Sequence, residues 1–487
     1  MLPVLLFAQF AVAANPSYSS ERVRDLVARA TVANHAPPPE LRGYRARVET
    51  EFSISLRDTL GRERAAQIEQ LSSKVVWTRD GKYDMHVVGY RSQSLGAPIS
   101  TLSFVNGWTE PTLYGDRLQL GVQLGAAADP KAKNKNRGSW IVAVHPFSYD
   151  RDRYYKFSGG DTVVVMQTAS RTIRLVRVHV TPRLGDATRL AAFEGEIDLD
   201  ADRHQIVRMR GQFVILSEKG RPTLSPIPGL VGVVYAEFVN AEIDGRFWLP
   251  AFQRTELQST FALLGQTRAV MRSVSHFSDH IVQTSDTLAA PNPRYETTHR
   301  TTWAPSDSVS RFGGWDAALG SATFDVNAND FEDVAPDIWK QTGPPRLDIA
   351  PTKTDNIFRY NRVEGLYTGL ELNLRMRSAV PGLSMGGSAG WAWTERTLRG
   401  GAHIGLRRDP WRTGIRAERQ LANTNDFTPP LNPESGGLAA MFGSVDDFDY
   451  VDRRIALASV TRVIGVSDAA LVTLQAGAGS DRAEVSR

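Results

Sequence analysis

The segment Phe358–Arg377 reads F-R-Y-N-R-V-E-G-L-Y-T-G-L-E-L-N-L-R-M-R, and it decides the fold. From residue 366 the even positions are Leu366, Thr368, Leu370, Leu372, Leu374 and Met376, and the odd positions are Tyr367, Gly369, Glu371, Asn373, Arg375 and Arg377. One face is nearly all apolar and the other carries charges over about eleven residues, the length and period of a tilted membrane-crossing β-strand. The candidate lumen-facing residues are therefore Tyr367, Glu371, Asn373 and Arg375.

The same alternation continues to the end of the chain. It is visible at residues 383–394, 402–407 and 411–418, and again near 454–464 and 469–478, with a long polar loop at 423–449. This makes about six strands, whereas bacterial single-chain barrels start at about eight. An open sheet leaves edge amides without partners in lipid. We therefore expect residues 357–487 to be the first part of an outer-membrane β-barrel that the sequence truncates.

Composition excludes several classes of protein. The chain has 57 Lys and Arg against 53 Asp and Glu, so no strong field favours nucleic acid as a partner. It has no cysteine, which excludes disulfides, thiolate metal sites and a lipid-modified amino-terminal Cys. We expect no cofactor.

The amino terminus resembles a secretory signal. An apolar run from Leu2 to Phe10 is followed by the small-residue site Ala11-Val12-Ala13. We expect residues 1–14 to be a signal peptide, which would send the chain out of the cytoplasm. A buried amino-terminal helix is the alternative.

Residues 18–285 predict one curved antiparallel sheet behind a leading helix. The helix is expected from a Ser20 cap to about Ala33, because Val23, Leu26, Val27 and Ala30 form one apolar stripe. Three tight turns, at residues 79–82, 200–203 and 243–246, predict β-hairpins. Residues 286–356 lose periodicity and predict a linker or plug, with a short helix at 329–339.

Parts of this region resemble the lipoprotein-carrier type of periplasmic domain, an open half-barrel closed by a helix. The matching features are the leading helix and the hairpins W-x-R-D-G-K-Y from Trp77, G-E-I-D-L-D…I-V-R from Gly195 and D-G-R-F-W-L-P from Asp244. The resemblance implies an apolar concavity for acyl chains, and hence a lipid or lipoprotein ligand. Inward apolar residues are also the default core of any such sheet.

The whole arrangement is similar to an uncharacterised outer-membrane family in which a carrier-like domain precedes a barrel. Its first barrel strand carries an R-[FY]-N-[RK]-V-E-G motif, which stands here as R-Y-N-R-V-E-G at 359–365. The resemblance makes Arg359, Asn361, Arg362, Val363, Glu364 and Gly365 the first-strand motif, and it implies insertion by barrel-assembly machinery. Members often begin with a carboxypeptidase-like regulatory domain, which this sequence lacks. The family has no established activity to transfer.

Patterns typical of catalysis or metal binding are weak. G-x-S-x-G occurs around Ser384 and Ser388, but in a period-two stretch rather than at a strand-to-helix turn. His276 and His280 lack a third ligand nearby, although they share one face of either a helix or a strand. Two loop clusters, Asp446–Asp449 and Lys131–Arg137, favour solvated loops over calcium or phosphate sites.

The leading hypothesis is a mainly β, non-enzymatic outer-membrane protein. Its periplasmic domain would bind or present a lipid or another apolar ligand, and its barrel would act as an anchor or pore in contact with outer-membrane lipid. The charged inner face would then either line a pore or fill a narrow barrel with salt bridges. The alternative is a soluble periplasmic lipid-binding protein with a second, non-membrane β domain.

Overall fold

The computed structural model describes residues 17–57, 63–94, 109–120, 141–167, 171–183, 191–215, 230–261, 268–285, 297–326, 330–335, 337, 339–340, 342–349, 356–408, 410–423, 450–464 and 470–484. The proposed signal peptide lies outside these residues. The chain divides into two compact units. The amino-terminal unit comprises Met1–Ser259 and Arg268–Val334, and the carboxy-terminal unit comprises Thr260–Thr267 and Ala335–Arg487. Both units are built mainly of β-strands, as the sequence predicts.

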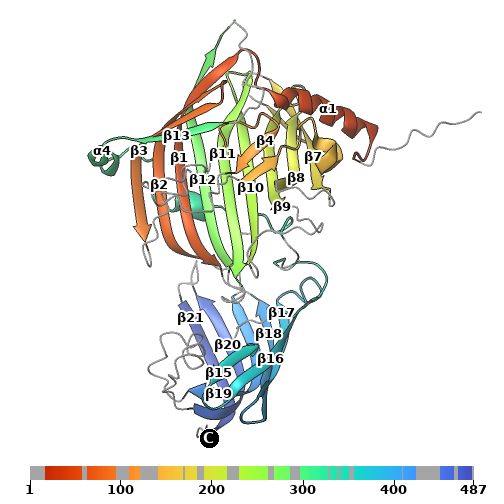
Figure 1. The fold of residues 1–487 in the computed structure, drawn as a ribbon, viewed down its shortest axis with the longest axis vertical. Helices are drawn as coiled ribbons and strands as arrows, with labels where there is room; N and C mark the ends of the chain where they lie inside the picture. The colour runs from red at the N-terminus through yellow and green to blue at the C-terminus, as the bar shows by residue number, and fades with distance from the viewer. Residues whose placement is uncertain are drawn as a thin grey trace, which may run out of the picture. The chain divides into compact units, whose positions relative to one another are not determined.

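The amino-terminal unit is a 13-stranded sheet with the order β13-β3-β2-β1-β12-β11-β10-β9-β8-β5-β4, in which β7 also pairs with β8 and β6 with β7 (Figure 1). The strands are β1 Leu41–Arg57, β2 Glu63–Thr78, β3 Lys82–Ser94, β4 Arg117–Leu120, β5 Ile141–Val144, β6 Tyr155–Gln167, β7 Thr172–Pro182, β8 Ala191–Asp200, β9 Ile206–Ile215, β10 Leu230–Ile243, β11 Phe247–Phe261, β12 Arg268–Thr284 and β13 Thr298–Trp303. Most pairs are antiparallel, but β13 runs parallel to β3 and β5 parallel to β8.

A helix, α1 Glu21–His35, occurs where the apolar stripe places one. Its first turn is capped by the Ser20 hydroxyl, which accepts a hydrogen bond from the Val23 amide. Val23, Val27 and Ala30 are fully buried against aromatic residues of the sheet such as Phe157 and Phe193. The helix therefore covers one end of the sheet's apolar face and contributes to its core (Figure 1). A short helix, α3 Arg151–Tyr154, precedes β6.

The three predicted hairpins are confirmed. They join β2 to β3, β8 to β9 and β10 to β11. The first turn uses Gly81 at φ 86°, and the third uses Asp244 at 53° and Gly245 at 63°. These left-handed conformations explain why Asp-Gly occurs at both turns, since the pair tolerates positive φ better than most residues.

The connecting region is more ordered than the sequence predicts. Within the expected linker, β13 extends the amino-terminal sheet, and two short helices, α4 Ser306–Ser310 and α5 Ser321–Phe324, follow it. The described residues between 329 and 339 form turns, so the helix predicted there is wrong. The predicted domain boundary at residue 285 is also too early, because the compact unit continues to Val334.

Residues 312–326 and 330–333, which we call the belt, pack on the polar face of this sheet. Glu51 on β1 is 1 % exposed and accepts hydrogen bonds from the amides of Gly320 and Thr323, both at 2.8 Å. Further along, Arg254 pairs with Asp330 at 2.8 Å and Arg210 with Asp333 at 2.8 Å. The strand expected to be half-buried at residues 44–57 is therefore buried on both faces over most of its length, with Arg45 and Leu56 exposed.

Below the belt lies a buried ion cluster centred on Glu256. Its carboxylate accepts hydrogen bonds from Arg254 at 2.9 Å and from Arg272 at 3.0 Å. Arg272 also contacts Glu63 at 3.0 Å and the Thr323 carbonyl at 3.1 Å. Burial raises the pKa of Glu256, but the two guanidinium groups outweigh burial and hold the pKa below its ordinary value. The cluster thus stays ionised and ties three strands, β2, β11 and β12, to the belt.

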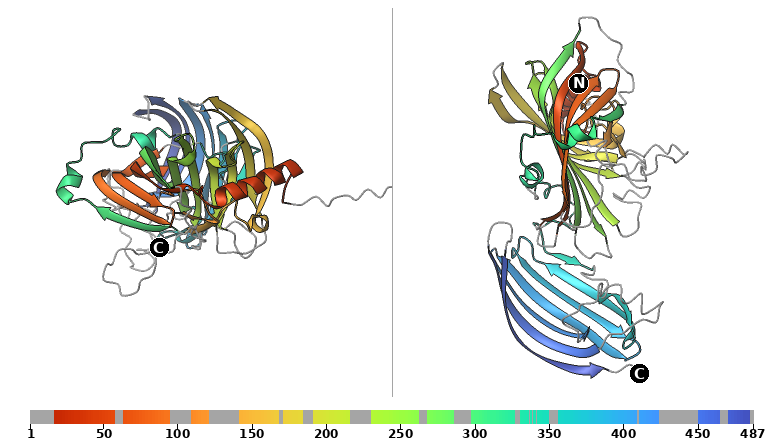
Figure 2. Two further views of the ribbon diagram at one scale, coloured as in Figure 1. Left: turned by 90° about the horizontal axis from the view of Figure 1, so that it is seen from above. Right: turned by 90° about the vertical axis from the view of Figure 1, so that its left-hand side faces the viewer.

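The carboxy-terminal unit is an eight-stranded curved sheet with the order β14-β16-β17-β18-β19-β20-β21, in which β15 also pairs with β16 (Figure 2). The strands are β14 Arg346–Asp348, β15 Phe358–Asn361, β16 Gly365–Arg375, β17 Leu383–Ala392, β18 Thr397–Arg408, β19 Trp411–Asn423, β20 Tyr450–Ile464 and β21 Ala470–Glu484. The described strands do not close into a barrel. No helix in the described part of the chain is long and apolar enough to span a bilayer.

The two faces of this second sheet differ in chemistry. On one face, every strand from β16 to β21 exposes large apolar side chains, namely Leu370, Leu372, Trp391, Leu398, Ile404, Trp411, Ile415, Val460, Ile464, Val472 and Leu474. The register places these residues on a common side, for example Met385 opposite both Leu374 and Ile404, and Ile404 opposite Ile415. We call this side the apolar face and the opposite side, which includes Tyr367 and Glu371, the polar face.

Candidate functional site: the polar face of the carboxy-terminal sheet

The R-Y-N-R-V-E-G motif forms the tight turn between β15 and β16. Asn361 Oδ1 accepts hydrogen bonds from the amides of Val363 and Glu364, at 3.1 and 2.7 Å. Gly365 follows with φ 62°, and a Cβ there would lie 2.0 Å from the Thr394 hydroxyl oxygen. The asparagine and glycine of the motif are therefore required by the turn itself.

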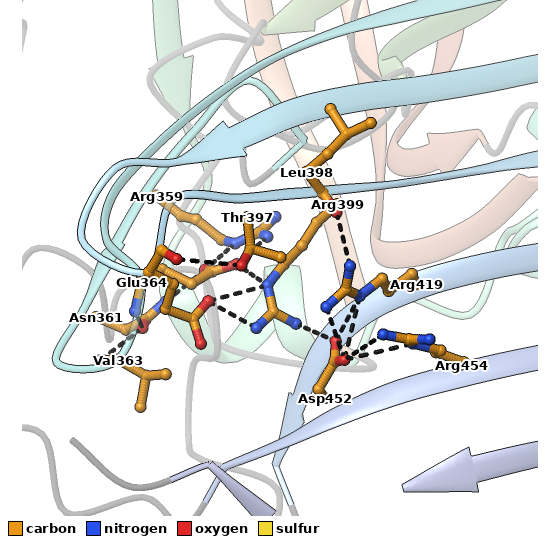
Figure 3. A network of polar contacts seen from close by, with 11 residues as sticks. Arg359, Asn361, Val363, Glu364, Thr397, Leu398, Arg399, Arg419, Asp452 and Arg454 are labelled. Atoms are coloured by element: carbon orange, nitrogen blue, oxygen red, sulfur yellow. Dashed lines mark hydrogen bonds and ion pairs between the residues drawn. The ribbon is translucent and has the colours of Figure 1, made fainter. Parts of the chain in front are cut away.

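Glu364 is the buried centre of this turn. Its carboxylate is fully buried and accepts hydrogen bonds from Arg359 and from the Asn361 amide, each at 2.6 Å. A third donor group, the guanidinium of Arg399 on β18, lies 3.1 Å away (Figure 3). Three donors compensate the cost of burying one carboxylate.

Arg399 extends the network across the sheet. It is 2 % exposed and contacts Glu364, Glu395 at 2.7 Å and Asp452 at 2.8 Å. Asp452 on β20 also accepts hydrogen bonds from Arg419 on β19 at 2.9 Å (Figure 3). The first strands of the sheet are thus linked to β20 through one chain of charged groups.

Tyr367 lies directly below Arg359. The guanidinium carbon is 3.5 Å from the centre of the tyrosine ring, which is the geometry of a cation–π contact. The ring covers Gly390 of the neighbouring strand, where an added Cβ would lie 2.3 Å from the tyrosine oxygen. Glycine is therefore needed at 390 so that the aromatic ring can lie flat on the sheet.

The remaining candidate lumen-facing residues lie on the same polar face. Glu371 is buried and accepts hydrogen bonds from Asn356 at 2.7 Å and Asn373 at 2.9 Å. Arg375 pairs with Asp348 of β14 at 2.7 Å. Among the motif residues, Val363 is buried, whereas Arg362 is exposed at the turn.

A polar cavity of about 540 Å³ opens on this face. Its lining includes four arginines and two glutamates, Arg359, Arg399, Arg416, Arg419, Glu371 and Glu418, together with His403 and several glycines of β17 to β19. The excess of arginine gives the cavity a positive bias. It could hold water and small polar solutes.

The weaker sequence patterns do not form sites in the described residues. Ser384 and Ser388 lie within strand β17, without the turn that a nucleophile elbow needs. The described residues contain no group of three or more side chains placed to bind a metal ion. The two loop clusters, Asp446–Asp449 and Lys131–Arg137, lie outside the described residues.

The expectation that His276 and His280 share a strand face is wrong. Asp279 between them has φ 54° and forms, with His280, a β-bulge opposite Ala46 of β1. His276 consequently lies opposite Glu49 on the polar face, whereas His280 packs against Tyr44 on the apolar face. An extra residue in a strand reverses the facing of every residue beyond it.

No family model matches this chain. No curated protein matches it either. Solved structures with some similarity include MucB in complex with MucA(peri), at 12 % identity over 94 % of each chain with a TM-score of 0.15. The PapC usher translocation pore follows at 10 % identity over 90 % of this chain and 80 % of that chain, with a TM-score of 0.12. A BenF-like porin from Pseudomonas fluorescens Pf-5 has 5 % identity over 91 % and 98 %, with a TM-score of 0.11. Similarity at these scores does not establish a shared fold.

The sequence analysis missed Arg399, Arg419 and Asp452, which complete the network. A usable signal for Arg399 was present, because the alternation noted at residues 402–407 continues back to Thr397, where β18 begins. On that register Arg399 falls on the same side as His403 and Tyr367. Asp452 gave no such signal, since its partners lie 33 and 53 residues away in the sequence.

Proposed function

We propose that this protein is a non-enzymatic outer-membrane protein whose carboxy-terminal sheet contacts lipid with its apolar face. The observation that carries the proposal is the band of exposed large apolar side chains that crosses every strand from β16 to β21. Soluble monomers rarely expose a contiguous apolar surface on this scale, and such patches mark membrane or protein contacts. The opposite face keeps its charges paired and buried, which suits the inside of a membrane barrel.

In this proposal the arginine–carboxylate network fixes the first strands against the later ones. During assembly of a barrel, strands that are distant in the sequence must come into one register. Until the barrel closes, the amides of its edge strands remain unpaired. The Glu364 turn, held by Arg359 and Arg399, sets that register early in the sheet. The same network occupies part of the interior, so the polar face serves first as structural filling and the cavity beside it as the polar lumen. Barrel-assembly machinery is the expected partner for insertion.

The amino-terminal unit is proposed to lie in the periplasm, where it binds or presents a lipid or another apolar ligand. Support comes from one part of its apolar face, near the carboxyl end of β1. There Phe52 is buried, but Ile54, Leu257 and Met271 are only partly buried and Leu56 is 50 % exposed. This looser packing contrasts with the fully buried cluster around Tyr44 and Leu249 on the same sheet. A carrier-like role rests on this difference.

Cell fractionation of the native gene product tests the membrane assignment. We expect the protein to stay in the outer-membrane fraction after alkaline carbonate washing. We also expect unboiled samples to migrate faster than boiled samples on a denaturing gel, because membrane barrels resist the detergent until heated. Recovery of full-length protein in the soluble periplasmic fraction, with one mobility before and after boiling, would favour the alternative of a soluble lipid-binding protein with a second β domain.

A further inference from the structure

A second cavity lies in the amino-terminal unit, where the hairpin turns meet the segment between α1 and β1. Its volume is about 810 Å³. Each of the three hairpins identified from the sequence contributes one arginine to its wall, namely Arg79, Arg203 and Arg246. This cavity lies at the amino end of β1, whereas the loosely packed patch around Leu56 lies at the carboxyl end of the same strand.

Arg79 is the unusual member of this set. It is 7 % exposed, and its Nη1 donates hydrogen bonds to the carbonyls of Pro37 and Pro38, at 2.8 and 2.5 Å. Carbonyl groups satisfy hydrogen bonds but do not neutralise a charge. No carboxylate among the described residues lies within ion-pair distance of Arg79, and its Nε has no hydrogen-bond partner. A buried cation is normally paired, so this side chain lacks a counter-ion.

A second polar group of the lining is also incompletely satisfied. Gln205, 7 % exposed, donates a hydrogen bond to the Tyr114 hydroxyl, but its own Oε1 has no partner within the described chain. An unpartnered oxygen can accept a hydrogen bond from a protonated ligand oxygen. Buried polar groups left without partners typically mark a site that a ligand or water completes.

The other two arginines are fixed differently. Arg203 is held by Glu242 at 2.9 Å and by the Gly245 carbonyl at 2.6 Å. Arg246 is 57 % exposed in its side chain; its guanidinium pairs with the rim carboxylate of Glu40 at 3.3 Å and lies 5.2 Å from the centre of the Phe247 ring. That exposed ion pair is weak and can be exchanged for another anion. Arg246 is therefore available to a ligand, whereas Arg203 mainly shapes the wall.

The remaining wall of the cavity is apolar. It consists of Val32, Ala33, Ala36 and the three prolines at 37–39. Val32 is 70 % exposed and presents apolar surface to the cavity. A basic wall facing an apolar wall matches a molecule with an anionic head and a short apolar body.

We propose that this cavity binds an amphiphile through its anionic head, a carboxylate or phosphate. The anionic head supplies the counter-ion for Arg79. The attached apolar group lies against Val32 and the prolines. This site is separate from the apolar patch invoked above for the carrier role, and it does not depend on the membrane assignment of the other unit.

Because the chain has no cysteine, an Ala28→Cys variant accepts one environment-sensitive fluorophore at an exposed position of α1, one helical turn from Val32 and outside the cavity lining. The probe is hexyl phosphate, titrated into the full-length protein, with hexanol and inorganic phosphate as separate controls. We expect saturable binding of hexyl phosphate at least about tenfold tighter than either control, because only it uses both walls. Equal responses to hexyl phosphate and hexanol would overturn the proposal. An equal response to inorganic phosphate would reduce the site to a simple anion site and would also overturn it.

Matched variants separate binding from folding. Arg79→Gln should weaken binding about tenfold or more, as expected for loss of one charge-assisted contact. Because Arg79 also holds the proline segment, the Arg79→Gln variant alone does not separate a binding defect from a folding defect. Glu40→Gln provides an independent test, since a folding defect would weaken binding rather than tighten it. Removing this competing carboxylate should tighten binding several-fold. Arg24→Gln removes an exposed arginine paired with Glu21 outside the cavity and should change nothing. Unchanged affinity in both Arg79→Gln and Glu40→Gln would refute the proposal.

Discussion

At the scale of single residues, Glu364 is the most constrained group of the carboxy-terminal unit. It is fully buried and has three donors from two strands and one turn. A buried carboxylate is tolerated only when its partners remain in place, and its loss leaves their charges uncompensated. The R-Y-N-R-V-E-G motif is therefore a structural requirement of the hairpin that joins β15 and β16.

A Glu364→Gln substitution tests this interpretation. We expect a loss of about 3 kcal/mol in the free energy of unfolding, because Arg359 and Arg399 would lose their shared anion. The measurement is denaturant unfolding of the folded protein, followed by tryptophan fluorescence. Glu395→Gln is the matched control, since Arg399 would keep Glu364 and Asp452, and it should cost clearly less. Equal losses in the two variants would contradict a special role for Glu364.

His145 predicts a pH dependence of the amino-terminal unit. Burial lowers its pKa from 6.5 to about 3, so the folded state keeps the imidazole neutral. The unfolded chain takes up a proton below pH 6.5, so this contribution to stability is complete above that pH. It is lost as the pH falls toward 3, at about 1.4 kcal/mol per pH unit. A His145→Gln variant should show a correspondingly shallower slope in unfolding experiments at pH 4 to 6.5, and an unchanged slope would contradict the assignment.

At the scale of elements, the belt explains where prediction from sequence succeeded and where it failed. Hairpins and alternating strands were predictable because turn residues and side-chain period are local properties of the chain. The burial of Glu49 and Glu51 was not predictable. Their alternation with apolar residues is typical of a solvated face, and the segment that covers them lies about 270 residues later, which no local pattern reveals.

The candidate site on the polar face of the carboxy-terminal sheet was likewise predictable only where local patterns determine it. The sequence placed Tyr367, Glu371, Asn373 and Arg375 on one face because strand parity is local. It could not identify which distant charges meet Glu364, since the pairing of β18 with β17 and of β20 with β19 decides that. The bulge at Asp279 also escaped notice, and it alone separates His276 from His280.

The belt gives a prediction at this scale. Glu51→Gln should weaken the charge-assisted hydrogen bonds to the Gly320 and Thr323 amides, at a local cost of about 1–3 kcal/mol. Hydrogen exchange of the full-length protein should then accelerate in residues 316–325, while β1 and β12 stay protected. Glu49→Gln is the comparison, because Glu49 holds the belt through one longer contact of 3.3 Å to the Asp316 amide. Faster exchange throughout the sheet instead would show that the belt and sheet unfold together.

At the scale of the whole molecule, the chain combines two β units that differ in how their polar and apolar faces are covered. In the amino-terminal unit, α1 covers one end of the apolar face and the belt packs on the polar face. In the carboxy-terminal unit, the polar face is internally paired and the apolar face is left exposed. Only the second arrangement leaves a large apolar face exposed, so the proposed membrane assignment rests on that unit.

Lipid contact along the apolar face is the most direct test of that assignment. Single cysteines at Leu370 and Leu474, on the first and last long strands, would be labelled with a polarity-sensitive fluorophore in the membrane-inserted protein. Cysteines at Ser388 and Gln475, which the register places on the polar face, serve as matched controls with opposite facing. We predict blue-shifted emission that is quenched by brominated lipids at 370 and 474 only. Equal emission and equal quenching at all four positions, or quenching by water-soluble iodide alone, would contradict the account.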